Sequence, residues 1–165
     1  MTRRLDPEEA LAGPMFFVAA MLVIVPLADF FLTVPPAEFS SRQWRFTTLG
    51  LLSGHTLLMV LGAALVLALS AVLKRYAVQR AMVIACLTSA AIFALLTFQF
   101  WVDMGNERIA TPPAEAPAVI SAANRAIIRL ILTTLAFAYL GWRARRMIPP
   151  ATRHKTPKPV HVISK

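Results

Sequence analysis

Four long runs of apolar residues, separated by short polar stretches, dominate the sequence. The runs cover residues 14–34, 47–73, 81–102 and 119–142. A helix needs about 20 residues to cross the roughly 30 Å hydrocarbon core of a bilayer. None of the runs alternates as a strand does, and an open strand cannot satisfy its backbone hydrogen bonds in lipid. The pattern therefore predicts an all-α fold, with residues 1–146 forming a bundle of four transmembrane helices.

Composition supports the membrane assignment. The chain has 165 residues, of which 58% are hydrophobic and 15% are charged, whereas a soluble domain has about 45–50% and about 25%. The net charge is +9, but the basic residues gather at the ends of the runs and in the last residues. The lipid bilayer, and not nucleic acid, is therefore the expected partner. The first run exceeds the 7–15 apolar residues of a signal peptide, so we predict that it is a retained helix.

The distribution of Lys and Arg predicts the orientation. Lys74, Arg75 and Arg80 lie between the second and third runs, and seven more basic residues follow the fourth. The connection between the third and fourth runs is net acidic. Cytoplasmic loops carry the excess of basic residues, so both termini are predicted to be cytoplasmic. Two arginines in the first connection, which is predicted to be periplasmic, do not fit this rule. The Pro-rich basic tail, residues 147–165, is predicted to be disordered and to attract anionic lipid.

Aromatic and basic residues mark the predicted membrane surfaces. Trp44, Arg45, Trp101 and Trp142 lie at the ends of the runs, as interfacial anchors do. Residues 39–46 are predicted to lie along the outer surface. The connection at residues 103–117 contains three prolines, so a continuous helix is not expected there.

Small residues predict where helices approach closely. Gly50 and Gly54 have G-x-x-x-G spacing, and Gly62 follows two turns later on the same face. Such a face packs against another helix in membranes, either a neighbour in the bundle or a second protomer. Cys86 is the single cysteine, and we expect it to pack as a small apolar residue.

The ionisable and amide side chains inside the runs all fall in the predicted outer half, whereas the inner halves are almost wholly apolar, with Ser and Thr the main exceptions. An ionised residue costs about 2.5–3.5 kcal/mol near the bilayer centre, so each needs a partner or a function. One interpretation is structural: Arg125 lies at the membrane surface and the side chain of Arg129 extends toward that surface, while Asp29 caps its own helix or pairs with Arg45. Asp29 and Asp103 could also balance the charges of the two arginines. The other interpretation is an outward-facing pocket for a proton, a small anion, a lipid headgroup or a quinone head, built from Asp29, His55, Gln99, Arg125 and Arg129.

Catalytic and metal-binding motifs are missing from the sequence. It contains no nucleophile elbow, zinc-protease helix, phosphate-binding loop or dinucleotide fingerprint. We therefore expect neither enzymatic activity nor a metal site. His55 could ligate the iron of haem or the metal of a chlorin, but no second intramembrane histidine accompanies it, so this cofactor is kept only as an alternative.

One segment of the sequence resembles a segment of other proteins. Residues 43–54 read Gln-Trp-Arg-Phe-Thr-Thr-Leu-Gly-Leu-Leu-Ser-Gly. This "WRF…GLLSG" segment resembles one found in small four-helix bacterial inner-membrane proteins. The resemblance covers about the first 70 residues, and it implies an architecture and an inner-membrane location without an activity.

Three functions remain open on the sequence. The first is a non-enzymatic accessory or assembly subunit that packs against other membrane subunits or its own copies. The second is a small binder or carrier that uses the polar pocket. The third is a haem- or chlorin-binding membrane subunit that uses His55.

Overall fold

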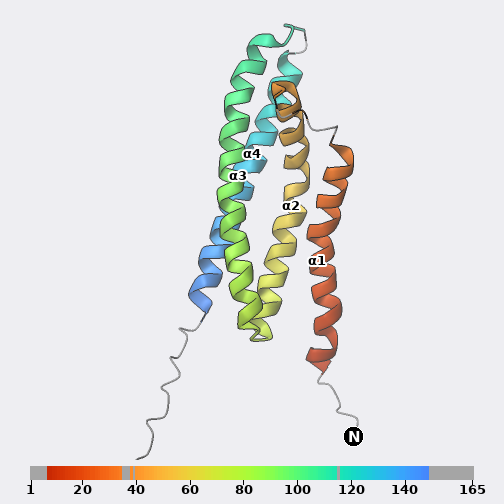
Figure 1. Cartoon of the computed structure of the whole chain (residues 1–165), viewed down its shortest axis with the longest axis vertical. Helices are drawn as coiled ribbons and strands as arrows, with labels where there is room; N and C mark the ends of the chain where they lie inside the picture. Colours follow the sequence, from red (N-terminus) through yellow and green to blue (C-terminus); the bar gives the residue numbers. More distant parts are fainter. Residues whose placement is uncertain (1–6, 35–37, 39, 115, 149–165) are drawn as a thin grey trace, which may run out of the picture.

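The computed structural model describes residues 7–34, 38, 40–114 and 116–148, without the side chains of 7–10 and 107–110. This part of the chain forms four helices: α1 (Pro7–Thr33), α2 (Arg42–Val72), α3 (Tyr76–Ala110) and α4 (Ala116–Met147). All four are long and apolar enough to cross a membrane, as the hydrophobic pattern predicted. They run alternately up and down, so the start of α1 and the end of α4 lie at the same end of the bundle (Figure 1).

The helices extend beyond the predicted apolar runs. Residues 103–117 do not form one continuous helix, as the prolines predicted, but α3 continues past the expected end of the crossing at residue 102 to Ala110. Polar residues do not break a helix, which ends where Thr111 is followed by Pro112 and Pro113. Pro117 lies in the first turn of α4, where a missing backbone N–H costs nothing. The lengths of the apolar runs therefore predicted where the helices lie, and proline determines where α3 ends and α4 begins.

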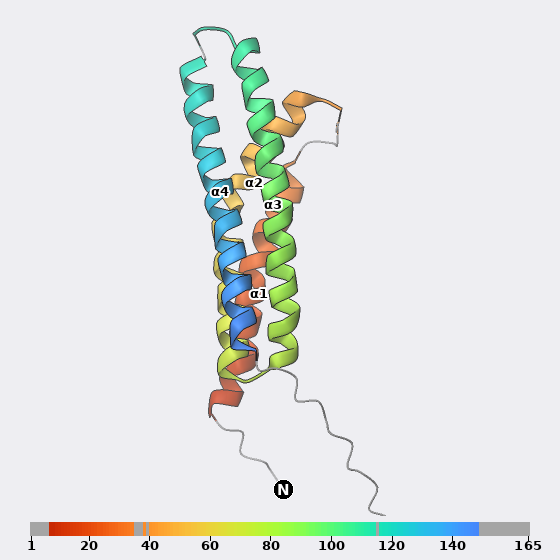
Figure 2. The same ribbon diagram turned by 90° about the vertical axis from the view of Figure 1, so that its left-hand side faces the viewer.

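The first connection also contains more helix than expected. Ser41 caps α2, because its Oγ accepts a hydrogen bond from the Trp44 N–H at 3.3 Å. The helix thus begins at Arg42, before the predicted crossing at residue 47. Its first turns lie across the bundle before the helix runs down along it (Figure 2). The predicted surface segment is therefore partly the start of α2.

Packing in the bundle is uneven. α3 and α4 pack together along their length and α2 contacts both, whereas in the described part of the chain the backbone of α1 approaches only that of α2. Gly62 permits this approach, because a Cβ atom there would lie 2.8 Å from the carbonyl oxygen of Ala19. Gly141 likewise permits a close approach of α4 to α3, where it lies beside Leu87. Most large side chains on the outside are apolar, up to Leu32 at 86% exposed, as a lipid-facing surface requires.

Two of the three glycines predicted to pack against a helix do not do so within the part of the chain that the structure describes. No atom outside the local helix lies within 4 Å of a Cβ atom built on Gly50 or on Gly54. The three glycines share a stripe only approximately, and the structure turns Gly62 toward α1 and the other two toward open space. The predicted tail lies outside the described residues, apart from Met147 and Ile148.

Candidate functional site: three polar clusters around α2

A buried carboxylate joins the start of α2 to α3, at the end of the bundle for which we predict the outer side of the membrane. Arg45 donates to both oxygens of Asp103, from Nε to Oδ2 at 3.2 Å and from Nη2 to Oδ1 at 3.3 Å. Gln99, one turn before Asp103 on α3, donates from Nε2 to Oδ2 at 3.1 Å. The Asp103 side chain is 3% exposed and that of Arg45 is 27% exposed. A bidentate, charge-assisted contact of this kind fixes geometry as well as adding stability.

Aromatic side chains continue this contact between the two helices. Phe46 follows Arg45 in α2 and stacks on Phe100 of α3, with ring centroids 4.9 Å apart and an interplanar angle of 7°. Phe100 is almost fully buried. Arg45 was predicted as an interfacial anchor, but it lies against Asp103 because the first turns of α2 cross the bundle at this point. We call Arg45, Gln99 and Asp103 the outer network.

The second cluster connects α1 and α2. His55 Nδ1 lies 3.6 Å from Asp29 Oδ2, with the two side chains 23% and 63% exposed. The ring of Phe30 lies edge-on to the His55 ring at 6.4 Å. This separation is longer than a hydrogen bond, and the exposure of Asp29 leaves the pair at the edge of the bundle.

The third cluster consists of two arginines between α2 and α4. Arg125 and Arg129 are exposed, and no hydrogen bond or ion pair of either side chain is found within the described residues. Both side chains line a hollow of 370 Å³ shared with Gly50, Ser53 and Phe46. Arg129 also lines the adjoining hollow of 330 Å³ with Gly54 and Leu57. The arginines therefore border a surface of α2 that includes Gly50 and Gly54.

The structure does not gather the five predicted site residues into one pocket. Asp29 and His55 lie between α1 and α2, Gln99 belongs to the outer network, and the two arginines border α4. Asp103 pairs with Arg45 and not with the arginines of α4, so that expected balance is wrong. α2 lies between α1 and α4 and so separates Asp29 from the arginines, whereas Arg45 and Gln99 already bind Asp103.

Two of the three clusters nevertheless lie at nearly the same height along α2. Arg129 borders Gly54, and His55 is the next residue of α2. Because one residue of a helix rises about 1.5 Å, the pair of Asp29 with His55 and the side chain of Arg129 meet α2 at nearly the same height. The sequence predicted a similar depth for Asp29, His55 and Arg129, and the tertiary structure decides on which side of α2 each of them lies.

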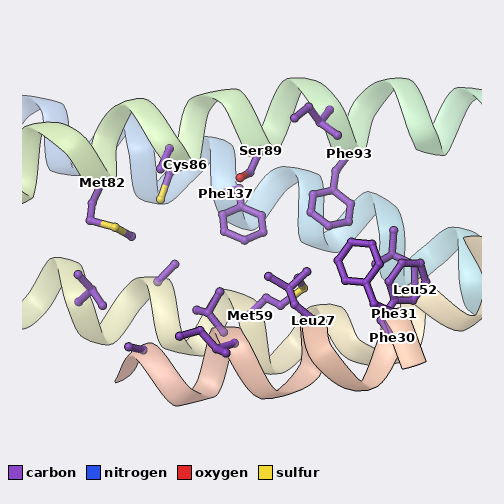
Figure 3. A pocket seen from close by; sticks show the side chains of 17 residues that line it. Leu27, Phe30, Phe31, Leu52, Met59, Met82, Cys86, Ser89, Phe93 and Phe137 are labelled. Atoms are coloured by element: carbon purple, nitrogen blue, oxygen red, sulfur yellow. The ribbon is translucent and has the colours of Figure 1, made fainter. Parts of the chain in front are cut away.

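An apolar cavity of about 630 Å³ lies between α1 and the other three helices. Figure 3 shows Phe30 and Phe31 of α1 at one end and Met82 of α3 toward the other, with Phe93 and Phe137 along the wall. The cavity exists because α1 packs on α2 alone and stands off from α3. Cys86 lies in its wall and is 1% exposed, so it packs as a small apolar residue.

The opposite end of the bundle carries structural contacts. Gln79 is buried in α3 and donates from Nε2 to the carbonyl oxygen of Ala144 in α4 at 3.4 Å. The guanidinium carbon of Arg146 lies 4.0 Å from the centroid of the Trp142 ring, a cation–π contact. Trp142 and Trp101 are both about half exposed.

Sequence reasoning treated the members of the outer network separately. Asp103 and Gln99 are four residues apart, a spacing that places them on one helix face, but the contribution of Arg45 comes from 58 residues away. Within the described part of the chain, no three His, Cys, Asp or Glu residues are grouped as a metal would require. The three clusters therefore offer charge pairing and hydrogen bonding.

Comparisons of this chain with protein-family models, with curated proteins and with solved structures found no match.

Proposed function

We propose that this protein is a non-enzymatic subunit of a membrane assembly, and that it associates with its partner inside the bilayer through the surface between α2 and α4. The single observation that carries the proposal is the pair of exposed arginines, Arg125 and Arg129, which border open glycines. We place the protein in the bacterial inner membrane with both termini in the cytoplasm, in line with the basic residues near Lys74 and after α4.

The energetic argument starts from the surroundings of these side chains. Arginine in the apolar part of a membrane costs about 2.5–3.5 kcal/mol on insertion scales, and it normally faces a protein interior or a partner. The described residues place no acid beside either arginine. A partner that supplies a carboxylate and packs against Gly50 and Gly54 would remove this cost and cover the exposed α2 backbone.

Co-purification from membranes in a mild detergent tests the proposal. We expect the wild-type chain to elute as a complex larger than one protomer, and the double variant Arg125→Gln/Arg129→Gln to elute as a folded monomer. Arg80→Gln is the matched control, because Arg80 is exposed on α3 near the opposite end. A wild-type protein that is monomeric throughout, with no partner after cross-linking in native membranes, would refute the proposal.

The apolar cavity favours a second candidate function, the binding of a hydrocarbon chain such as that of a lipid or a quinone. Its volume of about 630 Å³ lies within the usual range for small-molecule sites. Phe30 lines the cavity and also contacts His55, so a polar head could reach the pair of Asp29 with His55.

Native mass spectrometry of the detergent-purified protein checks this second candidate. A retained apolar molecule should disappear when Ser89→Phe fills the cavity, and should remain in Ser121→Phe, which changes an exposed serine of α4. An absorbance spectrum of the same sample tests the haem or chlorin alternative at His55. Equal retention by both variants would contradict binding in the cavity.

A further inference from the structure

One stripe of α2 lies between α1 and α4, and no described helix packs directly on it. It consists of Gly50, Gly54, Leu57 and Leu61, at spacings of four, three and four residues, which keep them on one side of a helix. Leu57 is 76% exposed and Leu61 is 48% exposed, and nothing lies within 4 Å of a Cβ atom placed on either glycine. We call these four residues the open α2 stripe.

A positive charge borders this stripe on the α4 side. Arg129 shares one hollow with Gly54 and Leu57, and shares a second with Gly50 and Arg125. Leu57 thus marks the edge of the stripe nearest α4.

A negative charge borders it on the α1 side. Leu58 of α2 lines a hollow with Leu22 and Val25 of α1, which is separate from the large cavity. Asp29 lies four residues after Val25 and seven after Leu22, so it belongs to the same stripe of α1. Its side chain is 63% exposed. Asp29 and Arg129 therefore flank the open α2 stripe from opposite sides, and they meet α2 at nearly the same level.

We infer that the partner at this surface is a second copy of the chain, arranged as a parallel dimer about a two-fold axis along the bilayer normal. This inference rests on the proposed function and identifies its partner. Rotation about that axis exchanges the two sides of the surface and keeps depth unchanged. It therefore brings Asp29 of each protomer to Arg129 of the other, while the two open α2 stripes meet at Gly54. Such an interface is isologous, the commonest arrangement of soluble homo-oligomers, and G-x-x-x-G supports close crossing of helices in lipid.

Charge complementarity favours a second copy over a lipid phosphate. A phosphate would meet the arginines but would leave the exposed carboxylate of Asp29 and the apolar side chains of Leu57 and Leu61 without a matching group. A second copy supplies the missing group on both sides, with two equivalent Asp29–Arg129 contacts. Asp29 can keep Oδ2 toward His55 and accept from Arg129 of the other copy through Oδ1.

Cysteine cross-linking of the full chain in native membranes tests the dimer. In a Cys86→Ala background, Leu61→Cys should give a covalent dimer on oxidation, whereas Leu95→Cys, exposed on α3, should not. Asp29→Arg or Arg129→Asp alone should lower cross-linking by about tenfold, and the two together should restore it, because the swap re-forms the contact. Gly54→Leu should also reduce cross-linking and adds no charge. Comparable protein abundance in the membrane shows that these variants fold.

These experiments distinguish a failure of the proposed dimer from a failure of the proposed function. No dimer from Leu61→Cys, together with a hetero-complex that Arg125→Gln/Arg129→Gln abolishes, would overturn the self-association and leave the proposed function standing. No dimer and no complex would overturn both. A dimer that is insensitive to either charge change, or that the swap does not rescue, would overturn the Asp29–Arg129 pairing. Loss of a bound phospholipid from the arginine variants, without a dimer in any variant, would assign the arginines to lipid.

Discussion

Arg45 and Asp103, 58 residues apart, form a bidentate contact that joins the start of α2 to the outer part of α3. Arg45 reaches the carboxylate because the first turns of α2 lie across the bundle (Figure 2). The carboxylate is buried and also accepts from Gln99. The contact therefore fixes the position of the first turns of α2, which immediately precede the open α2 stripe.

Removing the Asp103 charge should destabilise the bundle. Asp103→Asn leaves the Arg45 guanidinium without its counter-charge, and we expect a loss of about 1–3 kcal/mol in the free energy of unfolding, below the range for fully buried pairs because Arg45 is 27% exposed. Unfolding in mixed detergent and dodecyl sulfate measures it. Arg42→Gln is the control, since Arg42 is exposed in the same turn of α2. Equal stability of the two variants would show that the contact contributes nothing.

A methyl group at Gly62 should separate α1 from α2. In Gly62→Ala the new Cβ atom would lie 2.7 Å from Val23 Cγ2 and 2.8 Å from the carbonyl oxygen of Ala19. Because the second neighbour is backbone, the helices must move apart, at an expected cost of about 1–3 kcal/mol. Gly105→Ala is the matched change, with nothing within 4 Å, and it should be neutral or slightly stabilising. The same detergent titration compares the two, and the reverse order of stabilities would disprove the close contact.

The thiol of Cys86 should report on the position of α1. It is 1% exposed in the wall of the apolar cavity, and maleimides react with the thiolate, which apolar surroundings disfavour. We expect slow modification of the native protein and rapid modification after unfolding in dodecyl sulfate. Gly62→Ala should accelerate the native reaction, because displacement of α1 opens the cavity. Rapid modification of the wild-type protein would mean that α1 does not cover this wall.

Labelling of single cysteines should establish the orientation. In a Cys86→Ala background, a membrane-impermeant maleimide added to cells with a permeable outer membrane should label Ala114→Cys, at an exposed position between α3 and α4. It should label Lys74→Cys, between α2 and α3, only after lysis. This result follows from the excess of basic residues around Lys74. The opposite pattern would invert the assignment, and both termini would become periplasmic.

Sequence reasoning was most accurate where one physical requirement acts on a continuous segment. The four apolar runs located all four helices, because lipid demands both length and hydrophobicity from each crossing. It was least accurate at the helix ends. α3 runs on through Asp103 to Ala110, since polar residues mark the end of the hydrocarbon region without ending a helix.

Side-chain partners were harder to predict. The sequence singled out Asp29, His55, Gln99, Arg125 and Arg129 by depth alone. Depth follows from the roughly 1.5 Å rise per residue of a helix, but the choice of neighbour depends on how the helices rotate and which of them touch. Asp29 contacts His55, and Gln99 contacts Asp103. The arginines pair with neither acid, because Arg45 and Gln99 bind Asp103, and Asp29 lies on the other side of α2 beside His55.

The order of residues alone was enough to establish four helices of membrane-spanning length, because hydrophobicity and length are properties of each segment. The central place of α2 and the pairing of Asp103 with Arg45 emerged only when the helices were packed together. The same holds for Gly62, which packs against α1, while Gly50 and Gly54 stay open. These features depend on helix rotation and contact, which arise from all four helices jointly and are not encoded in the pattern of any one of them.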